Sequence, residues 1–78
     1  MSPCVMRIRN LRFLIYPQDH DPPHIHVRDP DGNEARFKLS DGTCYKNRGF
    51  SKKTVSEIEG ILFERKEFLL EVWHDWQE

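Results

Sequence analysis

The feature that most constrains the fold is the stretch over residues 24–39, where apolar and polar side chains alternate on both sides of a turn. Its centre, Asp29-Pro30-Asp31-Gly32-Asn33, consists of residues that favour tight turns. Alternation with period two on both flanks predicts a β-hairpin over residues 24–39 with one apolar face. A register slip of one residue would exchange the two faces. In the expected register the core receives Ile25, Val27, Phe37 and Leu39, and the opposite face carries His24, His26, Arg28, Arg36 and Lys38.

The segments around this hairpin complete an α+β pattern. Residues 5–16 predict two short strands separated at Asn10, and residues 40–50 predict a polar connection. Ser51 is a good N-cap, and after it apolar side chains recur three, four or seven residues apart until charges interrupt them at residues 64–67. We therefore expect a single domain over residues 1–78. It has a small antiparallel sheet of three to four strands, followed by one kinked helix or two C-terminal helices packed on one face.

Composition limits the class of protein. The chain has 78 residues and two cysteines, too few for the disulfide framework of a small secreted domain. It shows no signal peptide and no apolar run long enough to span a membrane, so a soluble cytoplasmic protein is expected. Residues 1–50 carry eight Lys and Arg against six Asp and Glu, and residues 51–78 are acidic. A basic front is compatible with binding of RNA or operator DNA. Because domains with so small a core are often stabilised by a partner subunit, a homo-oligomer is one alternative.

Three histidines within seven positions form the main candidate site. His24 and His26 lie two residues apart on the expected strand, so both imidazoles project from the same face. His20 precedes them in a proline-rich loop and is close enough in sequence to fold back as a third ligand. Neutral imidazole binds transition metals such as zinc, so His20, His24 and His26 are one candidate metal site.

The same imidazoles suit acid–base chemistry without a cofactor. Histidine titrates near neutrality, and cleavage of an RNA phosphodiester needs a base, an acid and a cation. His24 and His26 would exchange protons, and Arg28 and Arg48 would stabilise the developing charge. This is the endoribonuclease-type hypothesis, and the phosphate backbone would be bound by Arg36, Lys38, Lys46 and Arg48. The competing interpretation is a polar β-face whose histidines only form hydrogen bonds with their neighbours.

Two further segments contain candidate binding residues. Lys46 and Arg48 precede the expected helix start at Ser51, where free N–H groups favour an anion. Trp73 and Trp76 lie three residues apart near the end of the chain, and so share one helical face. Such a pair is usually core. A terminal helix in so small a domain has few partners, which raises the alternative that the two indoles form an interface.

The order of motifs resembles one family. The chain reads Arg-Phe-x-x-x-Tyr, then Asp-His-x-Pro-Pro-His-Ile-His-Val, Ala-x-Phe, Asn-Arg-Gly-Phe-Ser and Leu-Leu-Glu-x-Trp-His. This order resembles the bacterial family of unknown function numbered 4160, over roughly residues 5–76. The resemblance implies a component of a toxin–antitoxin module whose partner is a small cognate protein encoded in the same operon, a member of the family numbered 2442. A toxin-like component that acts on RNA is one expectation, and a noncatalytic protein-binding module, antitoxin-like or regulatory, is the alternative. The positions that match the motif are His20, Pro22, Pro23, His24, His26, Asn47, Arg48, Gly49, Phe50, Trp73 and His74.

Overall fold

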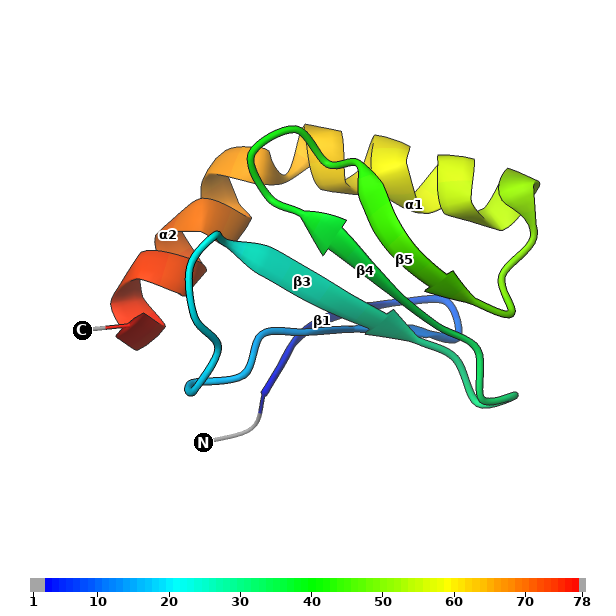
Figure 1. Cartoon of the computed structure of the whole chain (residues 1–78), viewed down its shortest axis with the longest axis horizontal. Helices are drawn as coiled ribbons and strands as arrows, with labels where there is room; N and C mark the ends of the chain where they lie inside the picture. The colour runs from blue at the N-terminus through cyan, green and yellow to red at the C-terminus, as the bar shows by residue number, and fades with distance from the viewer. Residues whose placement is uncertain (1–2, 78) are drawn as a thin grey trace.

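The protein is a five-stranded antiparallel sheet covered on one face by two helices (Figure 1). The computed structural model describes residues 3–77. Strands follow one another in the sheet in chain order, so every connection between neighbouring strands is a local turn or loop. The elements are β1 (Cys4–Ile8), β2 (Leu11–Leu14), β3 (His24–Arg28), β4 (Glu34–Lys38), β5 (Cys44–Arg48), α1 (Lys52–Glu64) and α2 (Lys66–Gln77).

This architecture confirms the α+β expectation and corrects the number of strands. The hairpin predicted over residues 24–39 is β3 and β4, and the two short strands predicted before it are β1 and β2. The segment that was expected to be a polar connection contains β5 at the sheet edge. An edge strand pairs on one side only, and Tyr45 to Arg48 of β5 are exposed, so no apolar alternation marked it in the sequence. No helix in the described part of the chain has the length and apolarity needed to cross a membrane.

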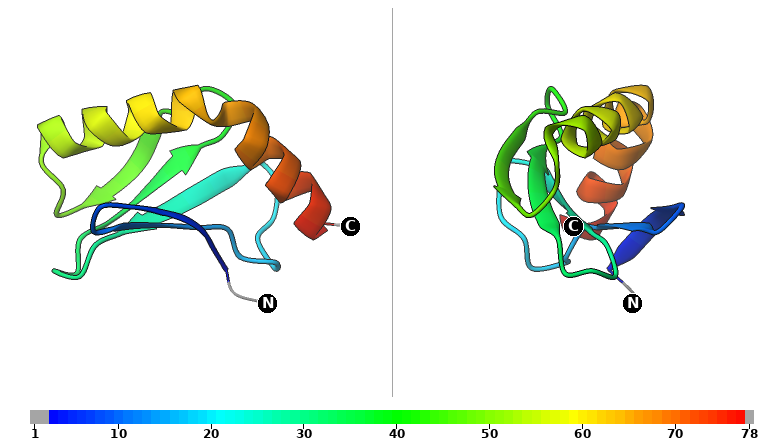
Figure 2. Two further views of the ribbon diagram at one scale, coloured as in Figure 1. Left: turned by 180° about the vertical axis from the view of Figure 1, so that it is seen from behind. Right: turned by 90° about the vertical axis from the view of Figure 1, so that its right-hand side faces the viewer.

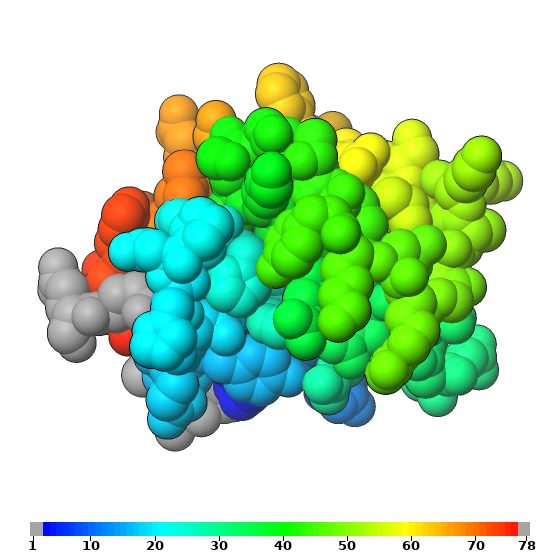
Figure 3. Space-filling model, viewed as in Figure 1, coloured from blue at the N-terminus to red at the C-terminus, as the bar shows by residue number. Residues whose placement is uncertain are grey.

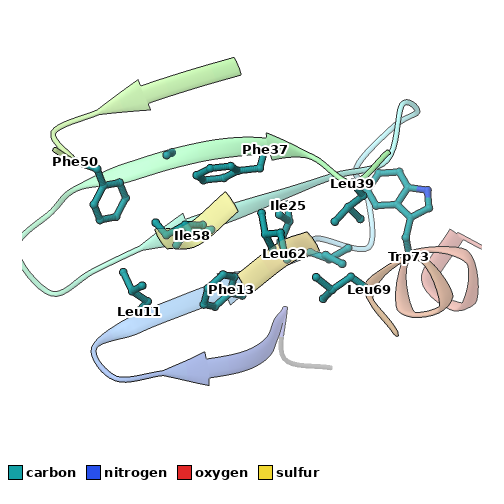
Figure 4. Packing of buried hydrophobic residues seen from close by; sticks show 13 residues of the cluster. Leu11, Phe13, Ile25, Phe37, Leu39, Phe50, Ile58, Leu62, Leu69 and Trp73 are labelled. Carbon is teal, nitrogen blue, oxygen red and sulfur yellow. The ribbon is translucent and has the colours of Figure 1, made fainter. Parts of the chain in front are cut away.

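The hydrophobic core lies between the sheet and the helices (Figure 4). Ile25 and Val27 of β3 and Phe37 of β4 are fully buried there, which confirms the predicted register of the hairpin. From the helices, Ile58, Leu62, Leu69 and Trp73 pack against them. Trp73 is 1% exposed and Trp76 is partly buried against the same cluster. The prediction of Trp73 as an interface residue therefore does not hold, because its indole belongs to this domain's own core.

Helix termini follow the local chemistry. Ser51 caps α1, and its hydroxyl accepts a hydrogen bond from the Thr54 amide at 3.1 Å. The helical pattern breaks at Arg65, whose amide donates to the carbonyls of Ile61 and Leu62, and α2 begins at the next residue. Residues 3–77 thus contain two helices. Both lie on the same side of the sheet, which leaves the other face open (Figure 2).

Candidate functional site

The site begins with two imidazoles at the start of β3. His24 and His26 lie on the face of the sheet opposite the helices, at the end that the loop before β3 covers, and their ring centroids are 5.3 Å apart. The Nε2 atom of each ring lies 3.5 Å from the same oxygen, Oδ2 of Asp19. None of the three side chains is more than 16% exposed. Three potential metal ligands, or three members of a proton-transfer group, therefore meet at one place.

Local hydrogen bonds hold Asp19 there. The chain turns after β2, and the Asp19 amide donates to the Tyr16 carbonyl at 3.0 Å. The Tyr16 amide in turn donates to Asp19 Oδ2 at 3.1 Å. The loop before β3 thereby brings the carboxylate onto the polar face of the sheet, beside the two imidazoles.

Hydrogen bonding also fixes the tautomer of His24. Its Nδ1 lies 2.9 Å from the carbonyl oxygen of Pro22. A carbonyl oxygen only accepts, so Nδ1 carries the proton and donates it. In the neutral ring, Nε2 then presents its lone pair toward Asp19.

His26 is the least satisfied polar side chain of the site. It is 6% exposed, and neither ring nitrogen has a hydrogen-bond partner within residues 3–77. Its Nδ1 lies 4.0 Å from Glu34 Oε1, and the Tyr16 ring packs edge-on against it at 4.9 Å between centroids. Burial lowers the pKa of His26 more than the nearby Asp19 carboxylate raises it. The imidazole is therefore neutral at pH 7, which leaves one of its nitrogens free to act as a ligand.

The composition of the three-residue group corrects the predicted metal site. Ligand atoms of Asp19, His24 and His26 all lie within 4.8 Å of one another, and this is the one such group in the described part of the chain. His20 does not belong to it. His20 is exposed and lines a shallow hollow with His24, Arg36 and Lys38. In the sequence, nothing distinguished Asp19 from Asp21, two residues further on. The hydrogen bonds between Tyr16 and Asp19 select Asp19 for the site.

The rest of the open face is strongly basic. Cross-strand pairing places Arg7 opposite Arg12 and Arg12 opposite Arg28, so three arginines lie side by side across β1, β2 and β3. The row continues through Glu34 of β4 to Arg48 of β5. Glu34 pairs with Arg28 at 3.2 Å. Like charges directly opposite each other destabilise a sheet.

A second row of side chains lies beside the arginine row. His26 is paired with Arg36, and Arg36 with Lys46. His24 is paired with Lys38 at the end of the sheet. The pairing register thus brings together the predicted nucleic-acid-binding residues Arg36, Lys38, Lys46 and Arg48 on one face.

The strand register corrects the expected anion site at the start of α1. Lys46 and Arg48 are cross-strand partners of Arg36 and Glu34, so they belong to the open face, whereas the helices cover the opposite one. Of that loop, Asn47 serves the turn: its side chain accepts from the Phe50 amide at 3.1 Å and donates to the Phe50 carbonyl at 2.9 Å. The four candidate catalytic residues also separate, with Arg28 and Arg48 in the arginine row and the imidazoles beside it.

Three contributors to the open face were missed from the sequence. Arg7 and Arg12 were assigned to strands without a face, and the fit of β1 to β2 decides where they lie. Tyr45 lies where the pairing of β4 and β5 shifts, and its ring centroid is 6.5 Å from that of His24. In the space-filling view the loop before β3, drawn in cyan, lies beside the green surface of β4 and β5 (Figure 3). Tyr45, half-exposed, offers a ring on which a base can stack.

Comparison with known proteins gives one match. The family model described as Domain of unknown function (DUF4160) matches residues 10–74, a range that contains β2 to α1, most of α2 and the three residues of the site. No curated protein and no solved structure matches the chain significantly.

Proposed function

Since the chain belongs to the DUF4160 family, we propose that it is the toxin-like component of a bacterial toxin–antitoxin module and that it acts on RNA. In this proposal the phosphate backbone lies across the open face of the sheet. The reacting end of that face is the start of β3, where His24 and His26 lie. The activity is of the endoribonuclease type.

The observation that carries the proposal is the arginine row. Arg7, Arg12 and Arg28 are direct cross-strand neighbours, and among these three only Arg28 has a carboxylate partner within residues 3–77, Glu34 at 3.2 Å. Folding gains nothing from placing like charges side by side, so this arrangement is best explained by a polyanionic ligand. Arg and Lys on an open sheet face, with an exposed aromatic ring beside them, are typical of surfaces that bind single-stranded nucleic acid.

RNA fits this face better than double-helical DNA does. The face is built from strands, and the helices cover the other side, so no helix is presented to a major groove. Tyr45, which is 49% exposed, offers a ring to unstacked bases, which RNA loops and single strands supply. Operator DNA binding, if it occurs in the module, is then assigned to the complex with the partner.

The proposal gives the chain a small cognate protein, encoded in the same operon, as its partner. Phe63 and Phe68, at the junction of α1 and α2, are 74% and 50% exposed. These two rings are the large apolar side chains that the helical layer offers to another protein, since Trp73 is buried. A partner bound there would leave the open face of the sheet free.

Expression in a bacterial host and an RNA cleavage assay test the proposal. We expect induced wild-type protein to arrest growth and purified protein to cleave RNA. The rate of RNA cleavage should fall at least about 100-fold in His24→Ala, and growth arrest should weaken with it, because an acid–base or ligand role contributes about 10²–10⁴-fold to such a rate. His74→Ala is the matched control, since His74 is exposed on α2 and belongs to no part of the site.

Two outcomes would contradict the proposal. Normal growth on induction, together with RNA that stays intact with and without added divalent metals, would exclude a toxin acting on RNA. Equal loss of activity in His24→Ala and His74→Ala would assign the effect to a general loss of folded protein, and the reacting end would have to lie elsewhere.

A further inference from the structure

We propose that Asp19, His24 and His26 form a four-coordinate binding site for a zinc-type divalent metal, with one coordination position left for water or substrate. This inference deepens the proposed function by naming the chemistry of its reacting end. The metal site itself is defined by the protein alone, and its test does not involve RNA.

Two of the three ligand–ligand distances are close to those of a tetrahedral centre, and the ligand atoms of the two imidazoles lie within 4.8 Å of each other. Both Nε2 atoms lie 3.5 Å from Asp19 Oδ2. With metal–ligand distances of about 2.1 Å, neighbouring ligands of a tetrahedral ion lie about 3.4 Å apart, whereas those of an octahedral ion lie about 3.0 Å apart. The same 3.5 Å distances are long for hydrogen bonds, and none joins either imidazole to this carboxylate within residues 3–77.

The buried imidazole of His26 points to a missing partner. The exposed fraction of His26 is only 6%, and both ring nitrogens lack hydrogen bonds in the described chain. Leaving a buried polar group unsatisfied costs about 1–3 kcal/mol, so native proteins rarely do it without a functional reason. A metal ion bound at Nε2 would satisfy one nitrogen at once.

The outer contact of His24 matches that of metal-binding histidines. Such a histidine usually presents one nitrogen to the metal and the other N–H to a carbonyl or carboxylate. His24 presents Nε2 to the shared centre and donates Nδ1–H to the Pro22 carbonyl at 2.9 Å. His26 likewise presents Nε2 to the centre, and its Nδ1 lies 4.0 Å from Glu34 Oε1, too far for a hydrogen bond. Both rings therefore present the same nitrogen to Asp19.

A fourth position stays available. In the described part of the chain no further His, Cys, Asp or Glu joins the group. Three protein ligands plus an open position are characteristic of catalytic zinc sites, whereas structural sites have four protein ligands. Such an ion lowers the pKa of a bound water to about 7 and polarises a phosphoryl oxygen. The adjoining hollow, lined by Arg36, Lys38 and Tyr45, is where a phosphate would approach.

Titration of the untagged, chelator-treated protein with Co²⁺ tests the site, because four-coordinate cobalt absorbs visible light far more strongly than six-coordinate cobalt. We expect one Co²⁺ per chain with the four-coordinate spectrum, displaced by Zn²⁺. Asp19→Ala and His24→Ala should each weaken binding more than about 100-fold, since loss of an outer-shell partner alone costs 10–100-fold. His20→Ala is the matched control and should bind as the wild type does. Circular dichroism confirms that each variant is folded.

Several results would overturn the site. These are absence of stoichiometric binding in the wild type, a six-coordinate spectrum, wild-type affinity in folded Asp19→Ala, and loss of binding in His20→Ala equal to that in His24→Ala. Failure of RNA cleavage with normal cobalt binding would refute the proposed function and leave the metal site standing. RNA cleavage without metal binding would do the reverse.

Discussion

Replacement of His26 by leucine should make the metal-free protein more stable. The imidazole is buried between Leu14 and Arg36, its direct cross-strand partners, and neither ring nitrogen has a hydrogen bond in the described chain. Leucine has a similar volume and no polar atoms, and the cross-strand neighbour on β2 is itself a leucine. The substitution thus removes an unsatisfied buried group without opening a large cavity.

The expected size follows from the cost of that group. An unsatisfied buried donor or acceptor costs about 1–3 kcal/mol. The nearby Asp19 carboxylate, 3.5 Å from Nε2, offsets part of this cost electrostatically. We therefore expect a gain of about 1–2 kcal/mol in the free energy of unfolding. For a domain of this size each kcal/mol shifts Tm by roughly 4–8 °C, so Tm should rise by about 4–16 °C.

Urea unfolding in the presence of a chelator measures the effect as a higher midpoint at unchanged m-value. His24→Leu is the control, because its Nδ1 is hydrogen-bonded to Pro22 and its ring contacts Trp73 at 5.3 Å between centroids, so it should lose stability. Added zinc should reverse the order: free metal at 100 times Kd stabilises the wild type by about 2.7 kcal/mol and leaves His26→Leu unchanged. A His26→Leu protein that is unfolded, or less stable than wild type by 1 kcal/mol or more in chelator, would refute the reasoning.

Four other substitutions test the fold and the partner surface. Gly49→Ala should lower the free energy of unfolding by more than about 1 kcal/mol in urea, because Gly49 has φ +107° and a Cβ there would collide with Asn33. Gly60→Ala, at an exposed position of α1, should raise it by about 0.5–1 kcal/mol. Equal effects of the two substitutions would contradict this reasoning. Ser51→Ala should cost about 1 kcal/mol in thermal unfolding through loss of the N-cap, and an unchanged Tm would show that the cap contributes nothing. Phe63→Ser should weaken co-purification with the operon partner at unchanged Tm, and full retention of the partner would move the interface elsewhere.

The hairpin was predictable because its sequence encodes both faces. Ile25 and Val27 alternate with His24, His26 and Arg28, and every one of these side chains lies on the expected face. The break between the helices was equally predictable from the sequence, because a run of charged residues interrupts the apolar stripe there. In both cases the burial pattern repeats with the period of the local structure.

What escaped prediction depends on contacts between segments. β5 has one neighbouring strand and mostly exposed side chains, so its sequence resembles a loop. Asp19 and His20 are equally polar and adjacent, and only the hydrogen bonds between Tyr16 and Asp19 select the carboxylate for the site. Trp73 is buried in the core because α2 crosses the end of the sheet, a packing that helical periodicity alone does not specify.

The salt dependence of RNA affinity tests most directly whether the open face binds the phosphate backbone. For single-stranded RNA, each neutralised phosphate contributes about 0.7 to the slope of log K against log salt concentration. We predict a steep negative slope for the wild type and a slope smaller by about 1.4 for the double variant Arg7→Ala/Arg12→Ala. Lys52→Ala/Lys53→Ala, which removes two exposed cations at the start of α1, should keep the wild-type slope. A wild-type slope in the arginine variant, or an equal loss in the lysine variant, would contradict the account.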